Sequence, residues 1–212
     1  MKQEFLNKLI TAKAEKRPTV VVTDLASGAQ SLWLGGEYDG DIAMTSGLSD
    51  GIDRTLRRDK GETYEENRVR NFLKTFPTPK RMIVVAAVHI AQSLVPMATL
   101  SGYDVTIVDP RQAFATEARF PSVSLQHDWP DEAMSALDSD RRTAVITLTH
   151  DPKLDDPALL VALRSPAFYI GALGSNRTHA KRLARLREAG LTESELARIQ
   201  APVGLDIGAV SP

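Results

Sequence analysis

Residues 167–190 read AFYIGALGSNRTHAKRLARLREAG, and this stretch decides the fold. An apolar run leads into the glycine loop GALGS at 171–175, and a strongly basic helical pattern follows. This order predicts a strand, a tight turn and a helix N-terminus in succession. Such a junction directs backbone N–H groups and the positive end of a helix dipole at one place, which suits a phosphate or another anion. A plain strand-to-helix turn, in which glycine and serine serve only geometry, explains the pattern equally well.

From residue 80 onward, apolar runs of strand length alternate with helical patterns. The run at 82–88 is apolar throughout, which is typical of a strand buried on both faces of a parallel sheet. This alternation predicts an α/β domain with a Rossmann-like, doubly wound parallel sheet. We expect its strands at 82–88, 103–109, 122–125, 143–149 and 168–170, and its helices at 90–100, 130–137, 157–164, 177–189 and 192–200.

The expected helix at 177–189 is rich in basic side chains. Ser175 is placed to cap it, and Arg177, one turn in, can reach the same anion as the loop. The other basic residues fall mostly away from the apolar face, so we expect them on a solvated surface. They are Lys181, Arg182, Arg185 and Arg187. The following segment begins with a capping-box pattern, Thr192 to Glu195.

The first 76 residues predict a small N-terminal α/β unit. We expect a helix at 1–16, strands at 19–24 and 30–34, and a helix at 52–58. The stretch 35–51 is rich in glycine and aspartate and offers few core residues. Pro77 and Pro79 mark a linker, because neither residue continues a helix or strand easily. The Rossmann-like domain then occupies 80–212, and its last two residues, Ser-Pro, form a helix-start signal that suggests a C-terminal truncation.

Composition bounds the class of protein. The 212 residues carry a net charge of −1 and are 42% hydrophobic, as in an ordinary globular protein. Near-neutral charge argues against a nucleic-acid binder. No apolar run approaches the ~20 residues of a stable membrane span, and no signal core is present, so we expect a cytoplasmic protein. The sequence has no cysteine, which excludes thiolate metal ligands and a cysteine nucleophile.

Ligands of a doubly wound sheet bind beyond the carboxyl ends of its strands. After the first strand, a dinucleotide fingerprint would read G-x-G-x-x-G/A. Here Ala86 and Val88 occupy the leading glycine positions, and only Ala91 fits. A Cβ atom at Val88 would crowd a pyrophosphate. These departures weaken ordinary NAD(P) binding without excluding it, so NAD(P) is the alternative ligand and an NAD(P)-dependent oxidoreductase the alternative function.

Other polar residues follow the same strand ends. His89 begins the first helix, where it could donate to a ligand, although capping or packing is the commoner role. Asp109 stands where a Rossmann protein binds a ribose hydroxyl, and Arg111 beside it could hold a phosphate. The alternative is an Asp-Pro turn with a surface arginine. His150 and Asp151 follow the fourth strand, but one such pair is too little for a metal site.

Four segments together resemble the XdhC/CoxI family of accessory proteins for molybdenum hydroxylases, such as xanthine dehydrogenase and carbon monoxide dehydrogenase. They are VHIAQSLVPMATLSGYDVTIVDPRQAFATEARFP (88–121), TLTHDPKLDDPAL (147–159), YIGALGSNRTHAKRL (169–183) and APVGLDIGA (201–209). The resemblance covers about 80–212. It implies a Rossmann domain that binds molybdenum cofactor, a molybdenum-bearing pterin with one phosphate.

The resemblance further implies a cofactor chaperone rather than a catalyst, and no catalytic residue is assigned. The family shields the cofactor, works with a cysteine desulfurase that supplies a terminal sulfide, and delivers it to the apo-hydroxylase. A homodimer is suggested only by analogy. Including the two fingerprint positions, the implied cofactor-binding residues are Ala86, Val88, His89, Asp109, Arg111, His150, Asp151, Gly171, Gly174, Ser175, Asn176, Arg177, Thr178 and Asp206.

The chain departs from the family pattern in places. Family members usually carry glycine where Ala86 stands, and the family's serine-glycine-glycine-cysteine stretch is not recognisable in 1–76. Without cysteine, any sulfur must come from a partner. A third interpretation is a protein-interaction module that has lost its ligand.

Overall fold

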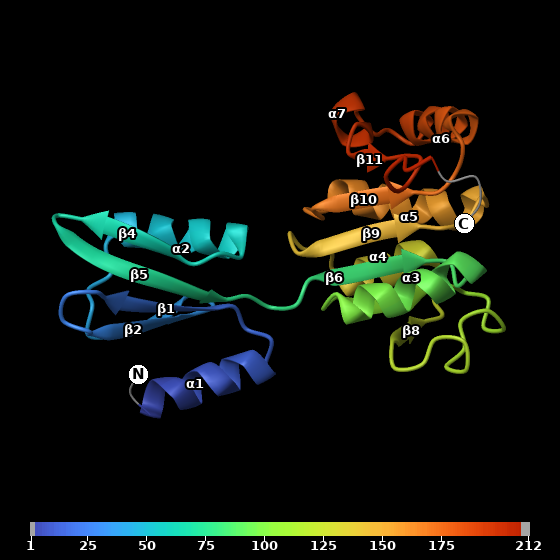
Figure 1. The fold of residues 1–212 in the computed structure, drawn as a ribbon. Coiled ribbons are helices and arrows are strands. Elements are labelled where there is room, and N and C mark those ends of the chain that lie inside the picture. The colour runs from blue at the N-terminus through green and yellow to red at the C-terminus, as the bar shows by residue number, and fades with distance from the viewer. Residues whose placement is uncertain (1–2, 209–212) are drawn as a thin grey trace. The chain divides into compact units, whose positions relative to one another are not determined.

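The computed structural model describes residues 3–208. The chain divides into two compact units, Met1–Thr78 and Pro79–Pro212, each with its own sheet and hydrophobic core (Figure 1). Within residues 3–208, no helix combines the length and the apolar character needed to cross a membrane.

The first unit is built around an antiparallel sheet. Its elements are α1 (Gln3–Ala14), β1 (Thr19–Asp24), β2 (Gln30–Leu34), β3 (Glu37–Gly40), α2 (Ser46–Arg58), β4 (Glu62–Glu66) and β5 (Val69–Phe76). Among the described residues the strand order is β3-β2-β1-β5-β4, so β1 is central. Val21 packs in one cluster with Phe5 of α1. Val20 and Val22 pack in another with Ile52 of α2, so the two helices cover opposite faces.

The sequence predicts part of this unit. The strands at 19–24 and 30–34 are confirmed, and the helix expected at 1–16 is seen as α1, with residues 1 and 2 outside the described part. The helix expected at 52–58 begins earlier, at Ser46, because the hydroxyl of Thr45 accepts a hydrogen bond from the Leu48 N–H at 3.1 Å. Leu48 is buried, so the expectation of few core residues is wrong for the end of 35–51.

No strand is predicted from the sequence where β4 and β5 lie. The inward face of β5 carries Asn71, Leu73 and Thr75, all of them buried. Two of these three residues are polar, so the strand lacks the alternation of apolar and polar residues by which a half-buried strand is recognised.

The second unit confirms the Rossmann-like expectation. Its elements are β6 (Arg81–Val85), α3 (His89–Leu100), β7 (Asp104–Val108), β8 (Ser124–Gln126), α4 (Pro130–Leu137), β9 (Thr143–Thr147), α5 (Pro152–Arg164), β10 (Tyr169–Ala172), α6 (Asn176–Glu188), α7 (Glu193–Leu196) and β11 (Ile199–Gln200). In the described residues the parallel strands lie in the order β11-β10-β9-β6-β7-β8. The chain winds outward from β6 in both directions, so the topological switch point lies between β6 and β9.

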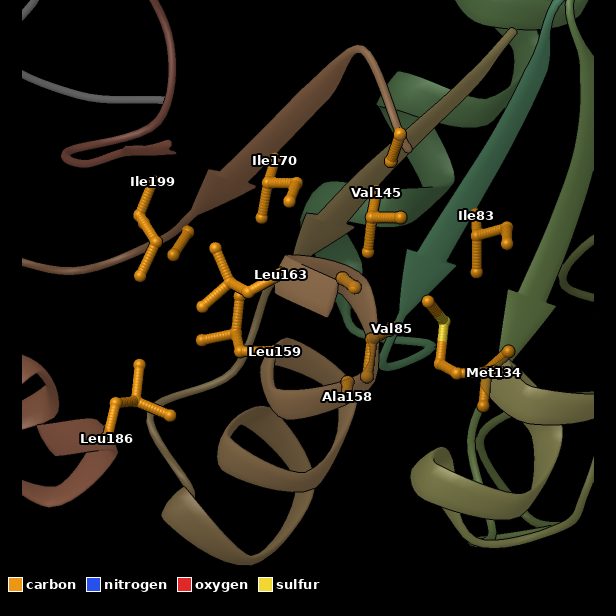
Figure 2. Close-up of a cluster of buried hydrophobic side chains, with 14 of the residues drawn as sticks. Ile83, Val85, Met134, Val145, Ala158, Leu159, Leu163, Ile170, Leu186 and Ile199 are labelled. Carbon is orange, nitrogen blue, oxygen red and sulfur yellow. The ribbon is translucent and has the colours of Figure 1, made fainter. Parts of the chain in front are cut away.

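Two apolar clusters fill the space on the two faces of this sheet. β9 is buried at every position, as a strand covered on both faces must be. One cluster joins the sheet to α4, α5 and α6. Figure 2 shows Ile170 of β10 on the side of Leu159 and Leu163 of α5, and Ile83 of β6 on the side of Met134 of α4. The other cluster joins the sheet to α3 and to the irregular connection between β7 and β8.

Some element boundaries differ from the expected ones. β6 ends at Val85 rather than at residue 88, because Ala86 takes a left-handed backbone conformation with φ of 83°. α5 begins at Pro152 rather than at residue 157, because Asp151 caps it. The helix expected at 192–200 ends at Leu196, and its last part is β11 instead, paired with β10. The predicted Thr192–Glu195 capping box is confirmed.

Ala86 should make the turn after β6 intolerant of larger side chains. Ala86→Val should lower the free energy of unfolding by about 2 kcal/mol or more, because a β-branched residue strains a buried position at positive φ. Ala86→Gly should change it by less than about 1 kcal/mol, because relief of strain offsets the lost methyl burial. Urea unfolding of the full chain measures both. A valine variant as stable as the parent would contradict this account.

Candidate functional site

The turns that carry the predicted site residues leave the sheet at one level. Val85 of β6 lies opposite both Val108 of β7 and Thr147 of β9, and Thr147 lies opposite Ala172 of β10. Each of these residues is the last of its strand. The turns that follow are therefore gathered along the carboxyl edge of the sheet, with the β6 and β9 turns flanking the switch point.

The turn after β6 is held by partners on the β7–β8 connection. The Ala86 N–H donates to the carbonyl oxygen of Val108 at 2.8 Å. The Ala87 N–H donates to Oδ2 of Asp109 at 2.8 Å, and the Ala87 carbonyl accepts from Nη1 of Arg119 at 2.9 Å. Both polar groups of the Ala87 backbone are thus engaged, and the start of α3 is fixed in place.

Asp109 is buried, and donors occupy both of its carboxylate oxygens. Oδ1 accepts from the backbone N–H of Arg111 at 3.0 Å and from its Nε at 2.9 Å, while Nη2 of Arg111 donates to Oδ2 at 2.8 Å. Burial alone would raise the pKa of Asp109, but the hydrogen bonds from Arg111 and Ala87 outweigh it and hold the pKa below the ordinary range. Asp109 therefore braces the turn and does not present a free carboxylate to a ribose.

Arg111 is partly exposed beside this brace. Its guanidinium carbon lies 4.4 Å from the ring centre of Phe114, a cation–π contact. The hydrogen bond with Asp109 raises its pKa, and the negative charge of Asp151 adds to the effect. The charges of the β7 and β9 turns thus act on each other at the sheet edge.

The two glycines of the glycine loop serve different structural roles. Gly174 has φ of 136°, and a Cβ atom there would lie 3.1 Å from the Thr178 side chain. Gly171 sits inside β10, where a Cβ atom would lie 2.7 Å from Cγ2 of Val203, so it allows close packing rather than ligand approach. The predicted cap is confirmed, because Oγ of Ser175 accepts from the Thr178 N–H at 3.2 Å.

A buried ion pair lies beneath the glycine loop. The sequence pattern predicts a solvated Arg182, and this prediction is wrong, because Arg182 is only 1% exposed. Its Nη2 donates to the carbonyl oxygen of Leu173 at 2.8 Å and lies 3.3 Å from Oδ2 of Asp155. Oδ1 of Asp155 and Nε and Nη1 of Arg182 have no hydrogen-bond partner among the described residues. Burial raises the pKa of Asp155 to about 7 in spite of Arg182.

The predicted site residues fall into two groups. Ala86, Asp109 and Arg111 lie at the β6 and β7 turns. His150, Arg177 and Thr178 line a pocket of about 310 Å³ together with Pro152, Lys181 and Arg185. We call these six residues the cationic pocket.

The predicted site residues outside these two groups lie at helix starts or on exposed loops. Val88 precedes α3 without a side-chain capping bond, and His89 is exposed as its first residue. Asp151 caps α5 through the Lys153 N–H at 3.0 Å. Asn176 is the exposed first residue of α6. Asp206 is also exposed and accepts a hydrogen bond from the Gly208 N–H at 3.0 Å.

Sequence reasoning missed several charged residues that shape this edge. They are Arg119, Asp155, Lys181, Arg182 and Arg185. All of them except Arg185 lie inside segments that carry the family resemblance, so membership of those segments was the available signal. The pairing of Asp155 with Arg182 spans 27 residues and has no local signature. In residues 3–208, no group of three His, Cys, Asp or Glu side chains is arranged to hold a metal ion.

The sequence profile of the XdhC Rossmann domain matches residues 82–212. The chain belongs to the XdhC family. The molybdenum cofactor insertion chaperone PaoD of Escherichia coli (strain K12) is 35% identical over 125 residues, which are 59% of this chain and 33% of PaoD. The uncharacterised protein YqeB of the same organism is 32% identical over 143 residues, 66% of this chain and 26% of YqeB.

The chain is also similar to two proteins named for xanthine dehydrogenase. A probable xanthine dehydrogenase subunit of Bacillus subtilis (strain 168) is 28% identical over 142 residues, 66% of this chain and 41% of that protein. This chain thus spans less than half of each curated relative's length. The crystal structure of a xanthine dehydrogenase from Bacillus halodurans matches with a TM-score of 0.73 and 21% identity, over 97% of this chain and 61% of that one. At this identity the likeness shows the fold.

The Asp109 brace should matter more to stability than its exposed partner. Asp109→Asn should lower the free energy of unfolding by about 3 kcal/mol, because it leaves buried donors mispaired. Arg111→Ala should cost about 1 kcal/mol, because its side chain is 40% exposed and solvent screens the pair. Because the pKa of Asp109 is depressed, the stabilisation is present near neutral pH and is lost as pH falls below about 3.9. Urea unfolding tests both variants, and the reverse order would contradict the assignment.

Asp155 should give the opposite pH dependence. Its raised pKa means that the fold favours the protonated carboxyl, so its contribution to stability falls as pH rises from the unfolded pKa of about 3.9 through about 7. The free energy of unfolding of Asp155→Asn, relative to that of the parent, should therefore rise by on the order of 1–3 kcal/mol from pH 5 to pH 8. Urea unfolding at both pH values measures this, with the exposed Glu188→Gln on α6 as control. A difference from the parent that is the same at both pH values would exclude the raised pKa.

Proposed function

We propose that this XdhC family member binds molybdenum cofactor and passes it to a molybdenum hydroxylase. The observation that carries the proposal is the carboxyl edge of the sheet, which holds both a fixed turn after β6 and the cationic pocket, where Arg177 and Lys181 have no ion-pair partner among the described residues. The relative named as a molybdenum cofactor insertion chaperone and the relative named for xanthine dehydrogenase support the same assignment.

The donor groups at this edge suit the organic part of the cofactor. The cofactor carries one phosphate, and Arg177 and His150 share a pocket in which an oxyanion would meet charge-assisted donors. Arg111 supplies a planar guanidinium with partial exposure, which can stack on an aromatic ring system such as a pterin. The chain has no thiolate to offer the metal, so it would hold the cofactor through its pterin and phosphate.

Sulfuration would then need a second protein. When bound, the cofactor supplies the molybdenum centre that receives the terminal sulfide. Without cysteine this chain cannot form a persulfide, so a cysteine desulfurase would have to bring the sulfur to the bound cofactor. Residues of this chain would bind and orient the cofactor during that step.

The nucleotide alternative lacks comparable support. In a Rossmann dehydrogenase the acid after the second strand is free to bind a ribose hydroxyl. Here the Asp109 carboxylate already accepts from Arg111 and Ala87. Ala86 also keeps a Cβ atom at a position whose backbone favours glycine.

The deciding experiment is anaerobic binding of cofactor released from a purified molybdoenzyme. The chain should retain pterin, detected by fluorescence after oxidation, and excess NADPH should not displace it. Addition of the loaded chain to an apo-hydroxylase should restore its activity, whereas the same chain without cofactor should not. Failure to retain pterin would overturn the proposal. Displacement of the pterin by NADPH would favour the nucleotide alternative.

A further inference from the structure

The cationic pocket draws its lining from two helices and one turn. Arg177, Thr178, Lys181 and Arg185 lie at successive turns on one side of α6. His150 and Pro152, from the turn after β9 and the start of α5, form the rest of the wall. Its volume of about 310 Å³ is at the lower end of the range for small-molecule sites, roughly 300–1,000 Å³. Its lining includes none of the β6 and β7 turn residues.

The carboxylates nearest this pocket are already engaged. Asp151 accepts from the Lys153 N–H at 3.0 Å as the cap of α5. Asp155 is buried against Arg182. Asp156 accepts from Nη2 of Arg185 at 3.0 Å and also from its Nε. Asp156 therefore neutralises Arg185, while Arg182 is buried with Asp155 and is not part of the pocket lining.

Arg177 and Lys181 are left with uncompensated charge. Within residues 3–208, neither side chain forms an ion pair. They stand four residues apart on α6, where like charges repel and destabilise the helix. Arg177 also lies in the first turn of the helix, which already carries a partial positive charge. A pocket that holds two unneutralised cations against this repulsion is suited to an anion.

We propose that the cationic pocket binds a phosphate group, with Arg177 and Lys181 as its principal charged donors. Arg185, held by Asp156, and His150 complete the wall around the anion. The sequence pattern predicts that Arg177 reaches an anion at the glycine loop. In the structure Arg177 lines the cationic pocket with Lys181, and residues 171–175 are not part of the pocket lining. Whether the phosphate belongs to the cofactor rests on the proposed function, whereas phosphate binding by the pocket does not.

Inorganic phosphate is the first probe, because it needs no cofactor. Phosphate should raise the melting temperature of the parent chain, since it binds the folded state alone. Arg177→Gln and Lys181→Gln should each weaken phosphate binding about tenfold or more, as expected for loss of one charge-assisted hydrogen bond. Each variant should also be as stable as the parent, or more so, without phosphate, because it removes a like-charge repulsion.

Arg187→Gln is the matched control. Arg187 lies on the same helix but pairs with Glu193 outside the pocket, so its loss should leave phosphate binding unchanged. If phosphate stabilises the parent and both pocket variants equally, or stabilises none of them, the proposal is wrong. Sulfate at equal ionic strength should act like phosphate, whereas chloride should not, which separates anion binding from screening.

Competition then identifies the source of the phosphate. If the pocket holds the cofactor's own phosphate, inorganic phosphate should weaken retention of pterin, and Lys181→Gln should lower pterin affinity in parallel. If the pocket serves a separate phosphate ligand, the chain should bind pterin and phosphate at the same time. Lys181→Gln should then weaken phosphate binding and leave pterin binding unchanged. Both results support the pocket. If the parent chain binds phosphate but retains no pterin, that result would count against the proposed function and not against the phosphate site.

Discussion

The carboxyl edge of the parallel sheet depends on the buried carboxylate of Asp109. One side chain at the end of β7 receives the N–H of Ala87 from the turn after β6 and the guanidinium of Arg111. Arg119 holds the same turn through the Ala87 carbonyl. The start of α3 is thereby fixed relative to two strands, in a backbone conformation that Ala86 adopts only under strain. That anchor fixes the β6 side of the switch point.

The parts of the fold that the sequence predicts are those fixed by local pattern. β6 and β9 are recognisable by their apolar stretches at 82–85 and 144–146, because both faces of the sheet are covered. Ser175 and Thr192 are recognisable caps because capping acts over three residues. β5 escapes prediction because tertiary contacts bury Asn71 and Thr75 on its inward face. At these two positions the polar character of the residues predicts exposure, but the packing of the whole unit buries them.

In the candidate site, the sequence predicts where the polar residues lie but not which partners they bind. Strand ends can be read from the sequence, so the positions of Asp109, His150 and Arg177 at one edge are predictable. Which of their donors and acceptors stay free is not, because the partners come from other segments. Asp109 looks like a ligand-binding acid in the sequence and is saturated in the fold. Arg182 looks solvated and is buried, because Asp155, 27 residues earlier, lies beneath the glycine loop.

The basic residues of α6 illustrate why charge composition alone does not locate a site. Arg182, Arg185 and Arg187 each have a carboxylate partner, so their charges serve the packing of α6 against its neighbours. The charge that remains is concentrated on one side of the helix. A cofactor chaperone must also release its ligand, and contacts made by partly exposed cations are weakened by solvent and salt. Under the proposed function, a rigid turn and partly exposed cations on the same edge of the sheet would hold a cofactor and then release it.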